Sequence, residues 1–171
     1  MIGDSWAEGL SPYFLASAAE SGKTLWTVIN DAGGCDSLIK QTEYIPKYII
    51  CCGLNDIQNL YPQAGDSSTQ KQKRYSFVLT GLVNALSKAN KDVYVCTFPK
   101  LQYPGGYKGC VNKSSLTLLN ACITSSMSGL RAHIINVPDS VSQNNMGDKI
   151  HLKNWKKLAD YIINQINQGR V

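Results

Sequence analysis

The chain has 171 residues, a length that suits one domain with a sizeable core. Hydrophobic residues make up 43% and charged residues 17%, which excludes an intrinsically disordered chain, and no apolar run reaches the roughly 18 residues of a membrane-spanning helix. The formal net charge is +5, but the basic groups lack the interleaved aromatic residues of a nucleic-acid surface. We therefore expect a globular protein with no membrane span and no nucleic-acid partner.

Short apolar and β-branched runs along the chain predict strands. In chain order they are Leu25–Ile29, Tyr48–Cys52, Val93–Thr97 and His133–Val137. Continuous apolar runs of this length suit strands that are covered on both faces, as in a parallel sheet. Only Met1 and Ile2 precede the first turn residues, so the first strand is expected to be very short. We interpret residues 1–171 as one domain excised from a larger protein.

Between these runs, apolar residues recur at helical spacing. The pattern predicts amphipathic helices over Tyr75–Leu86, Leu116–Leu130 and Trp155–Ile166, and a further helical stretch around Tyr13–Ala19. Strands that alternate with helices indicate βαβ units and an α/β domain. Two loops, Tyr61–Gln70 and Pro99–Asn112, each follow a predicted strand. We expect both at the carboxyl edge of the sheet, where open α/β folds bind ligands.

The cysteines raise the question of disulfides or a zinc site. They are Cys35, Cys51, Cys52, Cys96, Cys110 and Cys122. The chain has no C-x-x-C pair and only two histidines, so the spacing does not fit a zinc site. Several of these cysteines lie within apolar runs, where a thiol acts as a small buried hydrophobe. We expect reduced, structural cysteines.

The polar residues that suit catalysis fall into four short blocks. They are Gly3-Asp4-Ser5, Asn30–Ser37, Gly53-Leu54-Asn55-Asp56 and Asp148–His151. Ser5, at the start of a helix, would present its hydroxyl and N–H to the cleft. Asp148 lies three residues before His151 and can accept a hydrogen bond from its ring, which leaves the other ring nitrogen free as a base. Each block also has a structural interpretation, as a helix cap or as ordinary turn chemistry.

The second and third blocks suit the stabilisation of an oxyanion, because each follows a predicted strand. Asn55 offers a side-chain amide, and the glycines of the second block offer a backbone N–H. Gly33, Gly34 and Cys35 remain alternatives for that N–H, and we assign Gly34. His133 begins an apolar run and is expected to be a strand residue.

The four blocks, in this order, resemble those of the SGNH, or GDSL-type, hydrolase family. Gly3-Asp4-Ser5 resembles the nucleophile block, and Asp148–His151 resembles the last block, followed by a similar closing helix. The resemblance covers nearly the whole chain. It implies a three-layer α/β/α, flavodoxin-like domain with a parallel sheet of about five strands. The chain departs from the family's pattern in its missing upstream strand and in Cys35, which stands where the family often has its oxyanion glycine.

The resemblance also implies an activity, the hydrolysis of carboxylic esters through an acyl-enzyme. Ser5 would attack the carbonyl, His151 would transfer the proton, and Asp148 would orient His151. The Ser5 N–H, the Gly34 N–H and the Asn55 side chain would bind the oxyanion. No metal and no organic cofactor are implied.

Among substrates we favour O-acetyl groups on carbohydrate, which would make the protein an acetylesterase or O-deacetylase acting on a small-molecule or glycan ester. The chain has no long apolar cap to hold an acyl chain, whereas Tyr61, Tyr103 and Tyr107 in the flanking loops suit stacking on sugar rings. One alternative is a thioesterase or lysophospholipase, which an apolar groove beside Ser5 would favour. Another is a non-catalytic binding module that keeps the hydrolase fold. The sequence does not specify an oligomeric state.

Overall fold

The fold is built on a parallel β-sheet. The structure is a computed structural model that describes residues 1–15, 17–58, 67–105 and 111–169. Within these residues five strands lie in the order β2-β1-β3-β4-β5, and every pairing is parallel. The strands are β1 (Ile2–Gly3), β2 (Ala18–Ala19), β3 (Lys47–Cys51), β4 (Asp92–Cys96) and β5 (His133–Ile135). The predicted α/β class and the predicted sheet of about five parallel strands are confirmed.

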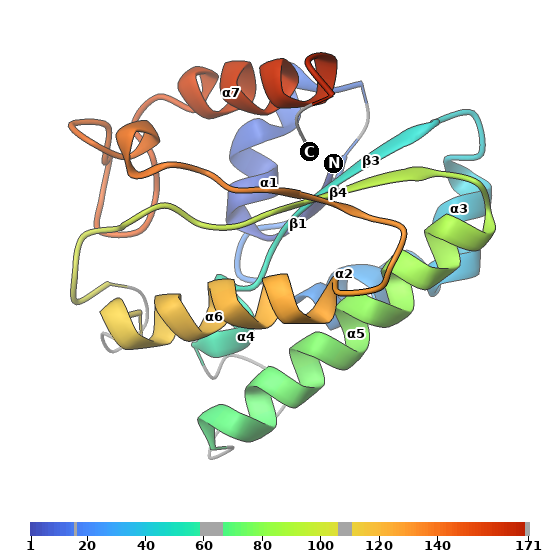
Figure 1. The fold of residues 1–171 in the computed structure, drawn as a ribbon, viewed down its shortest axis with the longest axis horizontal. Helices are drawn as coiled ribbons and strands as arrows, with labels where there is room; N and C mark the ends of the chain where they lie inside the picture. The colour runs from blue at the N-terminus through green and yellow to red at the C-terminus, as the bar shows by residue number, and fades with distance from the viewer. Residues whose placement is uncertain (16, 59–66, 106–110, 170–171) are drawn as a thin grey trace.

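Helices form a layer on each face of this sheet (Figure 1). They are α1 (Ser5–Leu10), α2 (Leu25–Asp31), α3 (Cys35–Gln41), α4 (Leu54–Ile57), α5 (Ser68–Lys88), α6 (Lys113–Ser126) and α7 (Lys156–Asn167), with short 3₁₀ turns at Ser11–Tyr13 and Asp139–Val141. Helices α1 and α7 lie together on one face, and α2 to α6 lie on the other (Figure 1). The fold is therefore the expected three-layer α/β/α arrangement.

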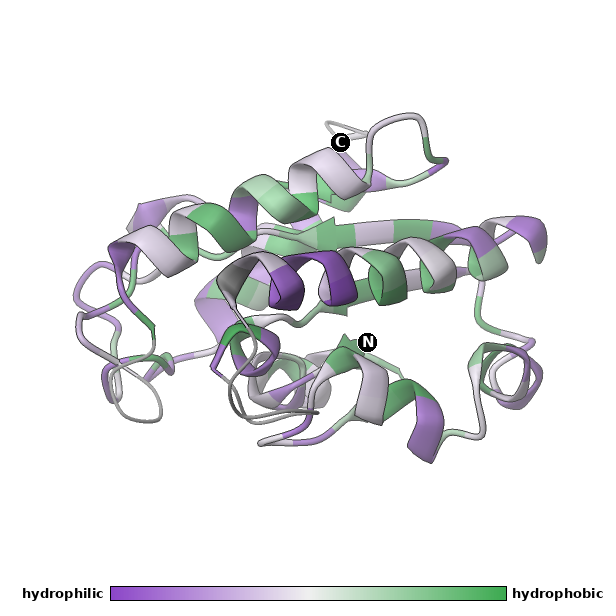
Figure 2. Cartoon of the chain, turned by 90° about the horizontal axis from the view of Figure 1, so that it is seen from below, coloured by the Kyte–Doolittle hydropathy of each residue, from purple (hydrophilic) through white to green (hydrophobic). Residues whose placement is uncertain are grey.

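The core lies between the layers, and Figure 2 shows hydrophobic residues concentrated along the central strands. Residues Tyr48 to Cys51 of β3 and Val93 to Cys96 of β4 are all buried. Trp6 of α1 is also fully buried, and its ring packs edge-on against Phe98 and Trp155, with ring centroids 5.1 and 5.3 Å away. This cluster joins α1 to the segment before α7.

The structure corrects the prediction of a strand over Leu25–Ile29, because these residues lie in helix α2. The Thr24 side chain caps this helix by accepting a hydrogen bond from the Thr27 N–H. Leu25, Val28 and Ile29 are the buried residues of α2, a spacing of three and four that belongs to a helix. The strand beside β1 is instead β2, a pair of half-buried alanines.

The helical stretch predicted around Tyr13–Ala19 is also wrong. The helix begins earlier, at Ser5, and ends at Leu10, where Pro12 supports a single 3₁₀ turn. The chain then reaches β2, whose Ala18 N–H bonds the Met1 carbonyl at 2.9 Å. Pairing with β1 thus outweighs the helical preference of the alanines.

The three long amphipathic helices are confirmed, with shifted ends. Helix α5 begins at Ser68, because Ser67 and Gln70 form a capping box, so the predicted loop Tyr61–Gln70 ends three residues earlier than expected, at Ser67. Residues 61–66 of that loop lie outside the described residues. Helix α6 ends at Ser126, before the predicted end at Leu130. No helix in the described part of the chain combines the length and the apolar character needed to cross a bilayer.

Candidate active site

The site begins at the turn where β1 ends and α1 starts. Gly3 has a φ of 153°, and a Cβ at this position would lie 2.1 Å from the Cys51 carbonyl oxygen, so only glycine lets β1 lie this close to β3. Asp4 caps α1 by accepting a hydrogen bond from the Trp6 N–H at 3.0 Å. Ser5 is thereby held as the first residue of α1, directly at the carboxyl end of β1.

His151 joins Ser5 to Asp148. The His151 Nε2 atom lies 2.9 Å from Ser5 Oγ, and its Nδ1 atom lies 2.7 Å from Asp148 Oδ2. A carboxylate only accepts hydrogen bonds, so the neutral ring carries its hydrogen on Nδ1 and turns the Nε2 lone pair toward Ser5. The three predicted residues therefore form one hydrogen-bonded row.

Hydrogen bonds from Asp148 and from Trp6 hold the turn that carries His151. The other oxygen of Asp148 accepts hydrogen bonds from the N–H groups of Ile150 and His151, at 2.8 and 2.6 Å. The indole N–H of Trp6 donates to the Ile150 carbonyl at 2.9 Å, which ties the turn to α1. The base is thus fixed relative to the helix that begins with Ser5.

The electrostatics of this turn favour an ionised Asp148. Burial by itself raises the pKa of the Asp148 carboxyl, but the hydrogen bonds from the His151 ring and from the N–H groups of Ile150 and His151 outweigh it and lower that pKa below its usual value. An ionised carboxylate at Nδ1 stabilises the imidazolium that forms when Nε2 takes up a proton.

Asp4 connects the turn after β1 with the turn after β3. Its carboxyl is fully buried, and besides Trp6 it accepts a hydrogen bond from the Gly53 N–H at 3.2 Å. Burial raises the pKa of Asp4, and hydrogen bonds from the backbone of Trp6, Gly53 and Asn55 act in the opposite direction. One buried carboxyl group thus positions both Ser5 and the block that contains Asn55.

Asn55 lies in this second turn, at the start of α4, and is 6% exposed. Its Nδ2 atom donates to the Lys23 carbonyl at 2.9 Å, and its Oδ1 atom accepts from Gln58 at 3.2 Å. An amide NH₂ group has two hydrogens, and the second one has no partner among the residues that the structure describes. Asn55 is therefore fixed in place and keeps one donor.

The structure places Gly34 away from this edge, so its assignment as an oxyanion donor is wrong. Its N–H donates to the Ile29 carbonyl at 2.9 Å, where it closes the end of α2. Its neighbours Ala32 and Leu38 line a cavity together with Lys47, the first residue of β3. Because Leu25–Ile29 is a helix and not a strand, the glycine block lies at the amino edge of the sheet.

Sequence reasoning missed the turn that follows the true strand β2, which contains Gly22. The N–H of Glu20 bonds the Gly3 carbonyl at 3.2 Å, and Lys23 accepts the bond from Asn55, so this turn lies beside both other turns. Gly22 has a φ of 78°, and its N–H has no hydrogen-bond partner within the described residues. The Thr24 cap, once recognised, would have indicated this turn from the sequence.

Comparisons with known proteins bear on the fold. No family model and no curated protein sequence matches the chain. Among solved structures, a putative acylhydrolase from Bacteroides fragilis superposes with a TM-score of 0.76 at 13% identity, covering 98% of this chain and 85% of that one. A GDSL-like lipase from Bacteroides thetaiotaomicron gives 0.74 at 13% identity, over 98% and 86% of the two chains. The chain has the GDSL-type hydrolase fold.

A third structure is an acetylxylan esterase from Geobacillus stearothermophilus. It superposes with a TM-score of 0.59 at 14% identity, over 86% of this chain and 69% of that one. The structures of this esterase include catalytic mutants in which a serine or a histidine is replaced by alanine. The GDSL-type fold of the present chain therefore occurs in ester hydrolases.

In this hydrolase fold the loop with Tyr103 lies against the histidine turn. The Gln102 N–H bonds the Lys149 carbonyl at 3.1 Å, and Tyr103 itself is half-buried. Tyr107 and Tyr61 lie outside the described residues. Among the tyrosines predicted to bind substrate, Tyr103 therefore lies in a described loop beside the site.

The cysteines in the described part of the chain are free thiols. In the described part of the chain the free cysteines are Cys35, Cys51, Cys52, Cys96 and Cys122, and all but Cys35 are buried. Cys110 lies outside that part. No group of three or more His, Cys, Asp or Glu side chains within the described ranges is arranged to hold a metal ion.

Proposed function

We propose that the protein is a serine esterase that hydrolyses carboxylic esters through an acyl-enzyme on Ser5. The observation that carries the proposal is the 2.9 Å contact between His151 Nε2 and Ser5 Oγ, with Asp148 on the other ring nitrogen. A nucleophile in contact with an oriented base is the arrangement that acyl transfer needs. The same residues argue against a non-catalytic binding module, because the whole constellation is present.

The proposed reaction proceeds in two halves. Ser5 Oγ forms a bond to the ester carbonyl carbon while its proton passes to His151 Nε2. The bond from that carbon to the alcohol oxygen then breaks, and His151 gives the proton to the leaving alcohol. Water attacks the acyl-enzyme by the same proton route, which releases the acid and restores the Ser5 hydroxyl.

Three donors are proposed to bind the oxyanion that forms between these steps. They are the N–H of Ser5, the N–H of Gly22, and the side-chain amide of Asn55. Gly22 replaces Gly34 because its turn, and not that of Gly34, adjoins the turns of Gly3 and Asn55. Donors held in place before the reaction stabilise the developing charge without reorganisation.

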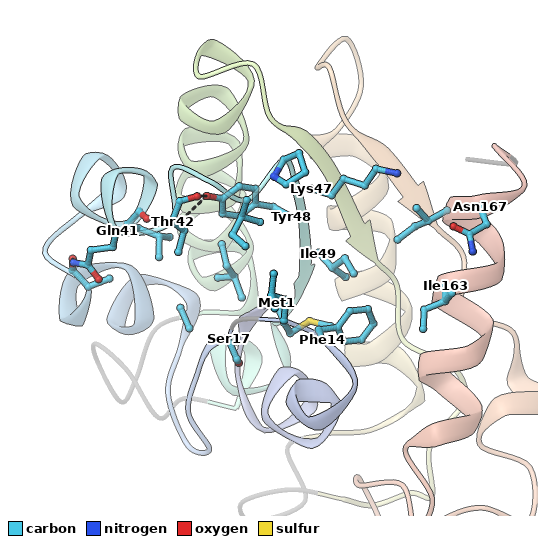
Figure 3. A pocket seen from close by; sticks show the side chains of 18 residues that line it. Met1, Phe14, Ser17, Gln41, Thr42, Lys47, Tyr48, Ile49, Ile163 and Asn167 are labelled. Carbon is cyan, nitrogen blue, oxygen red and sulfur yellow. Dashed lines mark hydrogen bonds between the residues drawn. The ribbon is translucent and has the colours of Figure 1, made fainter.

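For the substrate we propose an acetyl ester on carbohydrate. Tyr103 lies in a loop against the histidine turn, where an aromatic ring suits stacking on a sugar. The fold also occurs in an acetylxylan esterase. An apolar groove beside Ser5 would favour the thioesterase and lysophospholipase alternative, and the apolar cavity of about 410 Å³ is lined by other residues, at the amino edge of the sheet (Figure 3).

Turnover of p-nitrophenyl acetate by the wild-type and Ser5→Ala proteins tests the reaction, and p-nitrophenyl octanoate and acetylated xylan test the substrate. We expect release of acetate from xylan, faster turnover of acetate than of octanoate, and no turnover by Ser5→Ala. A fluorophosphonate reagent should label the wild-type protein once, at Ser5. Equal turnover by both proteins would refute the proposal, and a preference for octanoate would refute the substrate.

A further inference from the structure

Asp148 and His151 lie on a short hairpin in the segment that precedes α7 (Figure 1). The two arms of the hairpin pair in an antiparallel manner. The Gly147 N–H donates to the His151 carbonyl at 2.9 Å, near the tip. At the base, the Lys153 N–H donates to the Asn145 carbonyl at 2.6 Å. The hairpin therefore begins at Asn145 and ends at Lys153.

The Asn145 side chain extends this pairing by one residue. Asn145 is 8% exposed, and its Oδ1 atom accepts a hydrogen bond from the Asn154 N–H at 2.9 Å. Its Nδ2 atom donates to the carbonyls of Asn154 and Val141, at 2.9 and 3.1 Å. These bonds use both hydrogens of the amide as well as its oxygen. The side chain thus pairs with Asn154 as a strand neighbour would, and it ties the hairpin to the 3₁₀ turn that ends at Val141.

Two other hydrogen bonds hold the tip of the hairpin. The Trp6 indole N–H donates to the Ile150 carbonyl at 2.9 Å, and the Gln102 N–H donates to the Lys149 carbonyl at 3.1 Å. The two carbonyls belong to neighbouring residues. By themselves these bonds therefore leave the hairpin free to turn about one axis through its tip.

A turn about that axis would disturb the contact between His151 and Ser5. Their Nε2 and Oγ atoms lie 2.9 Å apart, and a hydrogen bond weakens steeply as its angle departs from linear. The bonds of Asn145 lie at the opposite end of the hairpin, so they oppose this rotation. Attachment at both ends fixes the orientation of the hairpin as well as its position.

We propose that Asn145 is a positioning residue, which holds the hairpin in the orientation that brings the His151 ring to Ser5. It acts through the backbone of Val141 and Asn154. The expected effect on reaction rate rests on the proposed esterase function. The expected effect on the orientation of the hairpin does not.

Substitution of Asn145 tests this role. Asn145→Leu keeps a similar size but loses all three side-chain hydrogen bonds, and Asn145→Ala leaves room for water to bond the freed backbone groups, which protects the fold. We expect kcat for p-nitrophenyl acetate to fall about 10- to 100-fold in both variants, the cost of a misplacement of about 1 Å. KM should stay unchanged, because Asn145 is not proposed to contact the substrate.

The matched control is Thr42→Val, which removes a hydrogen bond of 2.6 Å to the Leu38 carbonyl near the amino edge of the sheet. This variant should lose stability and keep its kcat. If Asn145 were important for stability alone, the folded fraction of its variants would also keep the wild-type kcat, and that result would overturn the proposal.

A measurement without substrate separates this proposal from the esterase proposal. In the wild-type protein the His151 ring protons should show a nuclear Overhauser effect to the Ser5 β protons. We expect this effect to be lost in Asn145→Leu and Asn145→Ala and to persist in Thr42→Val. Its persistence in the folded Asn145 variants would overturn the positioning role, whether or not the wild-type protein hydrolyses esters. Its loss, in a wild-type protein without turnover, would refute the esterase function and support the role of Asn145 in orienting the hairpin.

Discussion

The two edges of the sheet differ in how the polar groups of their backbone and side chains are hydrogen-bonded. At the carboxyl edge, buried Asp4 and half-buried His151 join the turns through hydrogen bonds of 2.6 to 3.2 Å. At the amino edge, the strand β3 borders an apolar cavity with backbone that pairs on one side only. The comparison teaches that the short strand β1 ends in well-ordered polar turns, whereas beside its start Lys47–Ile49 of β3 pair on one side only.

The largest effect should come from breaking the carboxyl edge at its reacting groups. Replacing Ser5 or His151 by alanine removes the proposed nucleophile or base, and turnover of an activated ester should fall by roughly 10⁴-fold or more. The double variant should be no slower than either single variant, since the two residues act as a unit. Initial rates with p-nitrophenyl acetate measure this, and additive losses in the double variant would contradict a shared mechanism.

The next effect concerns Asn55. Asn55→Asp keeps the size and the acceptor oxygen but loses both amide hydrogens and adds a charge. We expect kcat to fall by about 100- to 1000-fold, the usual cost of losing one oxyanion donor. Because the bond to the Lys23 carbonyl is lost as well, Tm should also fall, so kcat is measured on the folded protein as monitored by circular dichroism. Asn30→Asp, on the exposed face of α2, provides the control. Unchanged kcat in Asn55→Asp would assign Asn55 a purely structural role.

At the amino edge, Gly34→Ala should affect stability and not turnover. Gly34 has a φ of 92°, and a Cβ there would meet no atom within 4 Å, so the change costs backbone strain alone. That strain lowers the free energy of unfolding by about 1 to 3 kcal/mol. Denaturant titration measures the loss. A large drop in kcat of the folded variant would show that Gly34 contributes to catalysis, contrary to this expectation.

A further effect is a dependence of stability on pH that arises at Asp56, next to Asn55. Burial raises the pKa of the Asp56 carboxyl to about 7, although the Leu25 N–H donates to it. Between pH 4 and 7 the folded protein therefore holds a proton that the unfolded chain has lost, so this group makes stability fall as pH rises through that range.

Asp56→Asn removes the titrating group and should flatten this part of the stability profile. We expect the Tm of the variant to exceed that of the wild-type protein at pH 8 and to equal it near pH 4. Tm measured across this range tests the sign, and a wild-type advantage at pH 8 would show that the ionised carboxylate is stabilising.

The sequence predicted the contact between Asp148 and His151 because the two residues are neighbours on one turn. The contact between Ser5 and His151 was predicted only from the order of the four blocks and their resemblance to the GDSL-type family, since Ser5 lies 146 residues from His151 and the sheet topology brings them together. The fold class and the long helices followed from hydrophobic spacing. The Asp148–His151 contact and the long helices could be predicted because the residues involved lie close together within one turn or one helix.

The errors arose where the pattern was ambiguous. The run from Leu25 to Ile29 is apolar and β-branched, and a run of that length suits a buried strand or a helix equally. Two half-buried alanines in β2 carry no strand pattern at all. Once the strand was misplaced, the glycines after it were assigned to the wrong edge, and the turn with Gly22 was overlooked.

Trp6 links the position of Ser5 to that of the histidine turn. It follows Ser5 in the chain, its ring is clamped between Phe98 and Trp155, and its indole N–H holds the Ile150 carbonyl next to His151. Nucleophile and base are therefore linked mechanically, so that a tilt of α1 carries the histidine turn with it and preserves their spacing. Three aromatic rings in edge contact should give a near-ultraviolet dichroism band, and a change in that band would report a change in how α1 packs against Phe98 and Trp155.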